Sequence, residues 1–497
     1  MKTVVWFLAL LSAHITTLAG QAILPGRLPH VAVIGAGPQG VVAALELGAR
    51  GCNVTLFEKE TIILPIVETI QLDGFVYEYL SQLLIGGATF SGFGPPEVVS
   101  AFASKYGQPL EPLPASNVSL YFGSGPGLTT VPSFWLPLLA TPDGRQTLVQ
   151  QLAAGVAILQ QLDAAEPTPA GVLQLGIVAS PSQSFTDWAA QTKLPAFTDF
   201  VASFINSALS GPAGAAPAAH VLLDTRLYIL GGLRRTFLSL GIAPSSATAQ
   251  AAGIDSLLQG GPESTSLFHF PRGARVLFET AVASSSITLR LGVPVSAVSN
   301  DGLVTFYGGQ QRFDYVISSL RPEPAAAILS APLSQAFAPG QTGLVDLWIF
   351  NASVAQPTSA IGSQLLQPFI AARSTGVAGL AAPGDGSPSY ILRLDPGSPF
   401  VCAGAYVAPN TTQASTTNVV VSNMAAYGFN VASTVQYSRV QFPSTLPIQP
   451  ALNSFGKVFL LGEAVSGIGI ATALEYVPAQ INAWVAASAI DISNVNG

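Results

Sequence analysis

The sequence predicts an α/β protein whose parallel sheet is assembled from segments that lie far apart in the chain. The first observation is an apolar strand, a glycine-rich turn, a helix and a second strand near the N-terminus. The second is a strand near the C-terminus that ends in Gly462-Glu463 and leads into another helix. The third is a group of short apolar strands between residues 287 and 319. Strands that alternate with helices in this way are typical of a parallel sheet covered by helices.

The composition is that of a large protein rich in core residues. Of the 497 residues, 49% are hydrophobic and 9% are charged, whereas an ordinary soluble domain has about 25% charged residues. The 19 basic and 26 acidic residues argue against a nucleic-acid partner. Two cysteines exclude a disulfide scaffold, and the hydrophobic content excludes disorder. The length favours two or three domains.

We expect residues 1–22 to be a signal peptide. Lys2 provides a basic start, residues 4–11 are an apolar run, and small residues follow around Ala19. This pattern predicts secretion, or residence in the secretory pathway. Four Asn-x-Ser/Thr triplets, which are acceptors for N-glycosylation, agree with a glycoprotein. They begin at Asn53, Asn117, Asn351 and Asn410. No later segment has the length and apolarity of a transmembrane span.

The strongest motif follows the apolar strand 30–34. Its sequence is Gly35-Ala36-Gly37-Pro38-Gln39-Gly40, and residues 41–50 then have helical character. Gly35 permits a tight turn, Gly37 lets the backbone approach a pyrophosphate, and Gly40 lets helix and strand pack closely. The helix N-terminus offers N–H groups to phosphates. Glu58, at the end of the strand 51–57, can accept hydrogen bonds from ribose hydroxyls and disfavours a 2′-phosphate. Together these features predict a dinucleotide site.

The C-terminal motif identifies the dinucleotide through a resemblance. Strand 457–461 precedes Gly462-Glu463, and residues 464–469 lead into a helix over about 471–488. This arrangement resembles the flavin motif of FAD-dependent oxidoreductases of the amine-oxidase-like class. The resemblance implies FAD as cofactor, with Gly462 and Glu463 at its ribityl–pyrophosphate part and Ile468 near the isoalloxazine. N–H groups at the start of that helix can stabilise negative charge on a reduced flavin.

The middle segment completes the same domain. Residues 287–298 predict two strands, 302–312 a hairpin and 314–319 a further strand. In the amine-oxidase-like class a valine of this region contacts adenine through its backbone, and the resemblance implies Val295 in that role. The FAD-binding domain then comprises residues 28–80, 271–324 and 451–490. Because no second Gly-x-Gly-x-x-Gly motif precedes a helix in mid-chain, we expect flavin electrons to pass to oxygen or to an external acceptor.

Segments after Glu58 resemble a narrower family. Residues 73–77, 95–107, 110–112 and 184–188, together with a helical run to Ser210, are similar to fungal flavoproteins of the β-cyclopiazonate dehydrogenase family. These are accessory redox enzymes of secondary metabolism, many with a secretory signal. The resemblance implies a secreted enzyme that transfers a hydride from an apolar small molecule, such as a secondary metabolite, to flavin.

One segment departs from the pattern. Where the class has a Gly-Gly pair whose backbone approaches the pyrophosphate or flavin, this chain has Pro65 and Ile66. Pro65 has no N–H to donate, and Ile66 adds bulk. This departure is compatible with weaker FAD binding and with a protein that binds no flavin. Gly86-Gly87 is a candidate substitute for the missing glycine pair.

Residues 81–270 and 325–450 are expected to form the substrate domain. Residues 146–159 have apolar positions at helical spacing, whereas 343–350, 389–394 and 400–406 alternate like strands. Aromatic candidates for a pocket wall are Trp348, Tyr390, Tyr406 and Tyr476, although core packing is favoured for each. Cys402 and His269 are candidates for covalent flavin attachment or for a base, with a core position again favoured. The catalytic residues stay unknown, and no His or Cys cluster predicts a metal.

The fold predicted is therefore α/β, with a Rossmann-like FAD-binding domain assembled from discontinuous segments and a mixed-sheet plus helical substrate domain. The leading hypothesis is a secreted FAD-dependent oxidoreductase. A non-catalytic binding protein with the same fold is the first alternative, motivated by Pro65. An amine oxidase is the second. By resemblance a typical amine oxidase places a lysine near the flavin, and this chain has none between Lys193 and Lys457.

Overall fold

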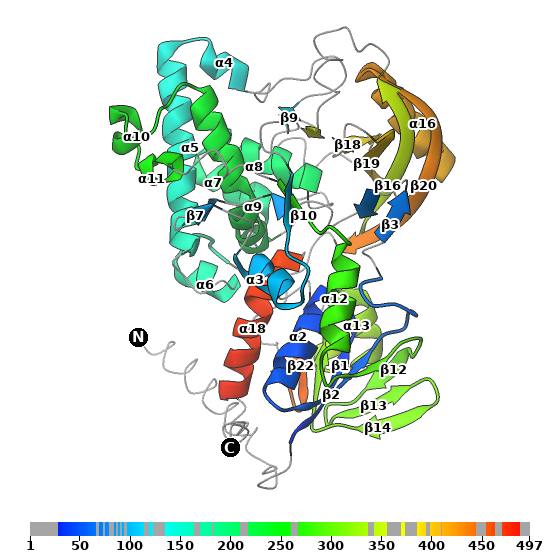
Figure 1. The fold of residues 1–497 in the computed structure, drawn as a ribbon. Helices are drawn as coiled ribbons and strands as arrows, with labels where there is room; N and C mark the ends of the chain where they lie inside the picture. Colours follow the sequence, from blue (N-terminus) through cyan, green and yellow to red (C-terminus); the bar gives the residue numbers. More distant parts are fainter. Residues whose placement is uncertain are drawn as a thin grey trace, which may run out of the picture.

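The computed structural model combines a parallel sheet, a mixed sheet and a group of helices (Figure 1). The parallel sheet and its helices occupy the lower part of Figure 1, and the other two parts lie above it. The structure describes residues 28–65, 69–72, 75–78, 84–85, 88–89, 92–93, 97–113, 119–122, 135–163, 169–180, 183–208, 217–259, 267–335, 342–354, 369–372, 385–393, 398–408, 410–443, 454–462 and 470–487.

The first sheet takes its strands from three distant stretches of sequence. Their order is β11 (Thr288–Arg290), β2 (Asn53–Phe57), β1 (His30–Ile34), β15 (Tyr315–Ser318), β22 (Val458–Leu460) and β21 (Ser454–Phe455). Neighbouring strands from β11 to β22 are parallel, and β21 is antiparallel to β22. The parallel strands therefore all end at one edge of the sheet. Gly35, Glu58, Ser319 and Gly462 follow there within one or two residues of a strand end.

Both faces of this sheet are covered, which explains its nearly continuous apolar strands. Val31 and Val33 pack on one face against α2 (Pro38–Ala49), α12 (Ala274–Ala283) and α18 (Ile470–Ala487). Ala32 and Ile34 face the other way. They pack against α13 (Pro322–Ile328) and a three-stranded meander of β12 (Val295–Val298), β13 (Leu303–Phe306) and β14 (Gly309–Arg312).

The second sheet is mixed, as predicted. Its order is β20 (Phe429–Pro443), β16 (Thr342–Val354), β19 (Phe400–Val407), β18 (Asp385–Arg393), β17 (Phe369–Ala372) and β9 (Ser119–Phe122). Only the β17–β9 pair is parallel among its neighbouring strands. Helix α16 (Gln413–Ala426) packs on one face, where Val420 and Met424 meet Trp348 and Phe350.

The helical part has a core of its own. Its helices are α4 (Leu136–Leu139), α5 (Pro142–Asp163), α6 (Pro169–Gln174), α7 (Phe185–Thr192), α8 (Pro195–Ala208), α9 (Ala218–Ser239), α10 (Ala247–Ala251) and α11 (Asp255–Gln259). The Trp135 ring stacks on Phe200 at 5.3 Å between centroids. Helix α18 joins this core, because Tyr476 donates a hydrogen bond to the Leu223 carbonyl (3.3 Å) and Glu475 pairs with Arg226.

Short elements connect these parts. They are the strand pairs β3 (Thr69–Leu72) with β4 (Phe75–Glu78) and β6 (Ala88–Thr89) with β7 (Gly92–Phe93), the small sheet of β5 (Leu84–Ile85), β10 (Leu267–His269) and β8 (Glu111–Leu113), helix α3 (Glu97–Lys105) and the 3₁₀ turn Leu333–Gln335.

The fold class predicted from the sequence is confirmed, with one correction among the helices. The run expected from Ser184 to Ser210 is two helices, because Lys193 has a left-handed backbone (φ 54°) that ends α7 and Pro195 starts α8. Within the described ranges, no helix is long and apolar enough to cross a membrane. The domain bounds given above stay a prediction.

Candidate dinucleotide-binding site

The turn between β1 and α2 has the geometry that its glycines require. Gly35 has φ 96°, a conformation that L side chains rarely adopt, and its N–H donates to the Phe57 carbonyl (2.8 Å). A Cβ added at Gly40 would lie 1.9 Å from the Gly35 carbonyl oxygen. The turn and the helix are therefore in direct backbone contact, as the motif predicts.

Gly37 differs from its neighbours because its surroundings are open. A Cβ added there would meet no atom within 4 Å. The residue precedes α2, in which Pro38 has no N–H and the first intrahelical bond runs from Val41 N–H to the Gly37 carbonyl (3.0 Å). N–H groups at such a helix start have no partner within the helix and attract anions. The space and the donors fit a pyrophosphate.

Ser319 fixes this turn from the neighbouring strand. Its Oγ lies 2.9 Å from both the Ile34 and the Gly35 carbonyl oxygens, so its hydroxyl can donate to either. Its N–H donates to the Ile34 carbonyl (3.0 Å). Sequence reasoning missed this residue, because a serine after an apolar strand has no signal of its own. Only the β1–β15 pairing brings it to the turn.

The carboxyl end of β22 approaches the same place. The Leu461 N–H donates to the Ser318 carbonyl (2.7 Å). A Cβ at Gly462 would lie 2.9 Å from the Leu320 carbonyl oxygen, so the close approach of these two chain segments requires glycine. Glu463 and Ile468, which were predicted beside the cofactor, lie outside the described residues.

Glu58, the residue predicted to bind the ribose, supports the turn. Glu58 is buried, with 6% of the residue exposed. One carboxylate oxygen accepts the Ala36 N–H (2.7 Å) and the other the Glu60 N–H (3.0 Å). A carboxylate has about four acceptor positions, so acceptor capacity remains for ribose hydroxyls. Cofactor binding by Gly35 to Gly40, Glu58 and Gly462 stays a prediction, now with a geometry that suits it.

The predicted adenine residue lies on the meander beside Glu58. Val295 is the first residue of β12 and pairs with Phe306. The Val293 N–H donates to the Glu58 carbonyl (2.9 Å), and the Glu58 N–H donates to the Arg290 carbonyl (2.9 Å). Sequence reasoning did not single out Arg290, which enters this region from the end of β11.

The segment that departs from the family pattern touches the turn through Leu64. The Leu64 N–H donates to the Ala36 carbonyl (2.8 Å), and Leu64 has φ 48° with its side chain fully buried. Pro65 follows and has no N–H, so this position cannot donate to a phosphate. Ile66 and Gly86-Gly87 lie outside the described residues. The turn keeps a geometry that suits a dinucleotide, and Pro65 offers it no N–H.

The other candidates of the sequence separate into two groups. Trp348 and Tyr476 are buried core residues; the Trp348 indole donates to Thr417 (3.0 Å) beneath α16. The side chains of Tyr390, Tyr406 and His269 lie outside the described set. Burial raises the pKa of the Cys402 thiol to about 12, so it stays protonated and is no base. The described residues contain no group of three His, Cys, Asp or Glu side chains that could hold a metal ion.

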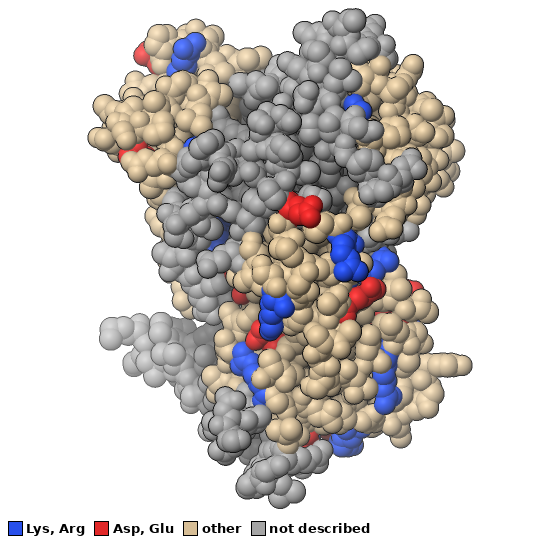
Figure 2. All heavy atoms as spheres, viewed as in Figure 1, with Lys and Arg blue, Asp and Glu red and all other residues tan. Residues whose placement is uncertain are grey.

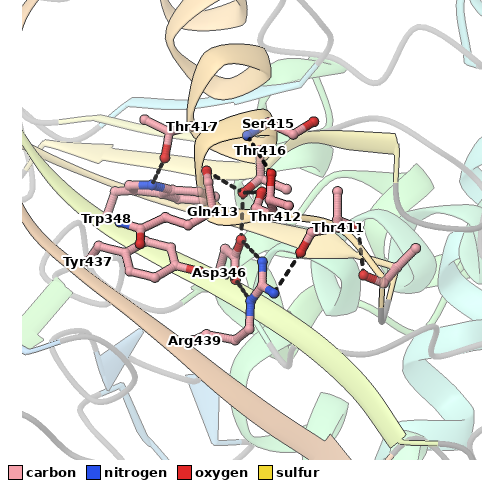
Figure 3. A network of polar contacts seen from close by, with 11 residues as sticks. Asp346, Trp348, Thr411, Thr412, Gln413, Ser415, Thr416, Thr417, Tyr437 and Arg439 are labelled. Carbon is pink, nitrogen blue, oxygen red and sulfur yellow. Dashed lines mark hydrogen bonds and ion pairs between the residues drawn. The ribbon is translucent and has the colours of Figure 1, made fainter.

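A second polar cluster lies between the mixed sheet and α16 (Figure 3). The buried Asp346 carboxylate accepts two hydrogen bonds from Arg439 (2.6 and 2.8 Å), one from Tyr437 (2.9 Å) and one from Thr416 (2.7 Å). Arg439 also donates to the Thr411 carbonyl (2.8 Å). Burial and the bond to Asp346 raise the pKa of Tyr437 to about 12. These hydrogen bonds link β16 and β20 to α16, so we assign the cluster a structural role.

Comparisons with known proteins agree with this architecture. A family model described as an NAD(P)-binding Rossmann-like domain matches residues 33–95, which include the turn and Glu58. A search of curated protein sequences gives no match. Among solved structures, a CLA-producing fatty acid isomerase from P. acnes has a TM-score of 0.62 at 14% identity, with 92% of this chain and 98% of that chain covered. The chain has an amine-oxidase-like fold.

Two amine oxidases share the fold, with TM-scores and sequence identities similar to those of the isomerase. Putrescine oxidase, in a structure bound to putrescine, has a TM-score of 0.59 at 13% identity and covers 93% of this chain and 99% of its own. Cyclohexylamine oxidase from Brevibacterium oxydans IH-35A has a TM-score of 0.55 at 14% identity, with 93% and 99% covered. At such identities the likeness concerns the fold alone, because one fold hosts many reactions.

Proposed function

We propose that this protein is an FAD-dependent oxidoreductase that takes a hydride from an apolar small molecule. The observation that carries the proposal is the sheet edge. Three distant parts of the sequence meet there. They bring Gly37 with open space around it, the Glu58 carboxylate, Ser319, and Gly462 in close contact with the Leu320 carbonyl. Ligands of open α/β sheets bind outside the carboxyl ends of the strands.

The roles that we assign agree with that geometry. The start of α2 binds the pyrophosphate, Glu58 binds the ribose, and Ser319 holds the turn in place. Bound FAD would supply the hydride acceptor, and the protein would orient the substrate and exclude water. Oxygen or an external acceptor would then take the electrons.

An apolar substrate agrees with the mixed sheet. The sheet face that points away from α16 presents buried apolar side chains, including Val345, Leu347 and Ile349. The fatty acid isomerase with this fold is named for an apolar substrate. The β-cyclopiazonate dehydrogenase family, a secondary-metabolite substrate and secretion belong to the same proposal, supported by the residues that resemble that family and by the pattern of residues 1–22.

Amine oxidation is the less favoured chemistry. The solved structures with this fold include the amine oxidases putrescine oxidase and cyclohexylamine oxidase. The chain nevertheless has no lysine between Lys193 and Lys457, a stretch that includes all of the mixed sheet except β9.

The visible spectrum of the purified, desalted protein tests the proposal. We expect the two absorption bands of oxidised flavin, retained in the wild type and absent from Gly37→Leu, because the leucine side chain would occupy the pyrophosphate position. The thermal unfolding midpoint of the flavin-free proteins should stay the same, since a Cβ at position 37 meets nothing within 4 Å.

Two results would contradict the proposal in different ways. A wild type without the bands, and with none after FAD is added, would favour the non-catalytic binding protein that Pro65 suggests. Unchanged flavin content in Gly37→Leu would show that the flavin binds elsewhere.

A further inference from the structure

Arg290 is the one basic side chain described at the carboxyl ends of the parallel strands that packs on two aromatic rings. It ends β11 and pairs in register with Phe57 of β2. Its guanidinium carbon lies 5.5 Å from the centre of the Phe57 ring and 5.2 Å from that of Phe306. Within the described part of the chain, no carboxylate or carbonyl accepts a hydrogen bond from this half-buried guanidinium.

Arg290 is also the direct neighbour of Glu58. The Glu58 N–H donates to the Arg290 carbonyl (2.9 Å), and the Gly292 and Val293 N–H groups donate to the Glu60 and Glu58 carbonyls (2.8 and 2.9 Å). These bonds fix the segment after β11 against the segment after β2. The acid predicted to bind the ribose and Arg290 are therefore neighbours at the same edge of the sheet.

The chemistry of this arrangement is that of a preformed donor set. A guanidinium carries five N–H donors in one plane, and contact with the Phe57 and Phe306 rings holds the group in place without using those donors. Adenine ring nitrogens and ribose oxygens are acceptors. We propose that Arg290 binds the adenosine end of the dinucleotide, beside Glu58. This inference rests on the proposed dinucleotide site and adds a residue to it.

A structural role would look different in binding data. If Arg290 only covered Phe57 and Phe306, an unbranched apolar side chain would cover them equally well and ligand affinity would not change. Methionine at position 290 therefore separates packing from binding. Lysine keeps the charge and the contact with the rings but loses the planar fork of donors.

The test is a titration of the purified protein with FAD, ADP and FMN, followed by flavin fluorescence or by competition. We expect Arg290→Met to weaken FAD and ADP binding at least tenfold and to leave FMN binding within twofold, since FMN has no adenosine. Arg290→Lys should fall between methionine and wild type. Arg312→Met is the matched control, because Arg312 lies on the meander but is exposed and pairs with Asp301; its affinities should stay within twofold.

The outcomes distinguish this inference from the proposed function. FAD and ADP affinities of Arg290→Met within twofold of wild type would overturn the role of Arg290 alone. An equal loss of FMN binding would also overturn it, because the substitution would then act on the whole site. If Arg290→Met does not fold, the ADP-to-FMN affinity ratio of Arg290→Lys decides. A wild type that binds ADP but no FAD would refute the flavin proposal and leave the Arg290 test intact.

Discussion

At the residue scale, two glycines of the Gly35–Gly40 motif have different surroundings. A methyl group at Gly40 would collide with a backbone carbonyl, which cannot move without opening the turn, whereas a methyl group at Gly37 would project into open space. Gly37 also has φ −68°, which every residue tolerates. The fold therefore requires glycine at position 40 but not at position 37. We expect that glycine at position 37 serves ligand binding instead.

This difference predicts opposite results for two matched alanine variants. Gly40→Ala should lower the free energy of unfolding by about 1–3 kcal/mol through overpacking. Gly37→Ala should change it by less than about 0.5 kcal/mol. Urea unfolding without cofactor measures both, and equal losses in the two variants would contradict the geometry described for the turn.

His220 in α9 provides a prediction about acid. Burial lowers the pKa of its imidazole to about 4, from an ordinary 6.5. The unfolded chain therefore binds a proton between these values while the folded one does not, so this contribution to stability is complete above about pH 6.5 and is lost as the pH falls towards 4.

We expect wild type to lose up to about 3 kcal/mol more than His220→Phe between pH 7.5 and pH 4.5. Urea unfolding of both proteins at the two pH values measures the difference in their losses of unfolding free energy. The carboxylates are the same in both proteins, so their titration cancels in this difference. Parallel losses in the two proteins would show that His220 does not titrate with a lowered pKa.

The sequence predicts the candidate site residues that belong to one contiguous motif. It misses those that reach the site through the pairing of strands distant in sequence. Gly35, Gly37 and Gly40 have fixed spacing, and their geometry agrees with the prediction. Ser319 reaches the turn because β15 pairs with β1, and Arg290 reaches Glu58 because β11 pairs with β2. Hydrophobic patterns indicate that these strands exist but do not give their order in the sheet.

At the element scale, the cluster around Asp346 anchors a helix to a sheet. Asp346 is fully buried, whereas the Arg439 side chain is 27% exposed. The two residues lie 93 positions apart and meet because β16 pairs with β20, with Asp346 opposite Arg439. The sequence predicts the strand over 343–350, but it contains no sign that the aspartate in this strand is buried and paired.

Arg439→Leu should be strongly destabilising. It would leave the Asp346 carboxylate buried without its cation, at a cost of about 3–5 kcal/mol. Arg312→Leu is the control, since it breaks an exposed pair with Asp301 that contributes about 1 kcal/mol or less. Urea unfolding at neutral pH compares the two, and a similar small loss in both would mean that Asp346 does not depend on Arg439.

At the scale of the whole molecule, the visible basic side chains and the proposed ligand site lie mostly in the same part. On the face shown in Figure 2, most of the visible basic side chains lie over the lower, Rossmann part, and the described surface above it has few charges. The low overall charge therefore agrees with a sparsely charged described surface in the upper part and with the proposed cofactor site below it. The parallel sheet is built from strands of three distant segments, so a ligand at its edge would contact groups that unfolding separates completely.

This arrangement predicts that the dinucleotide stabilises the entire molecule. A ligand that binds only the folded protein adds RT ln(1 + [L]/Kd), about 2.7 kcal/mol when its concentration is 100 times Kd. We expect FAD to raise the unfolding midpoint of wild type in a concentration-dependent way and to leave that of Gly37→Leu unchanged. ADP should raise it as well, because the turn, Glu58 and Arg290 are all proposed to bind the adenosine and pyrophosphate part. Stabilisation of Gly37→Leu by FAD equal to that of wild type would place the site away from the turn.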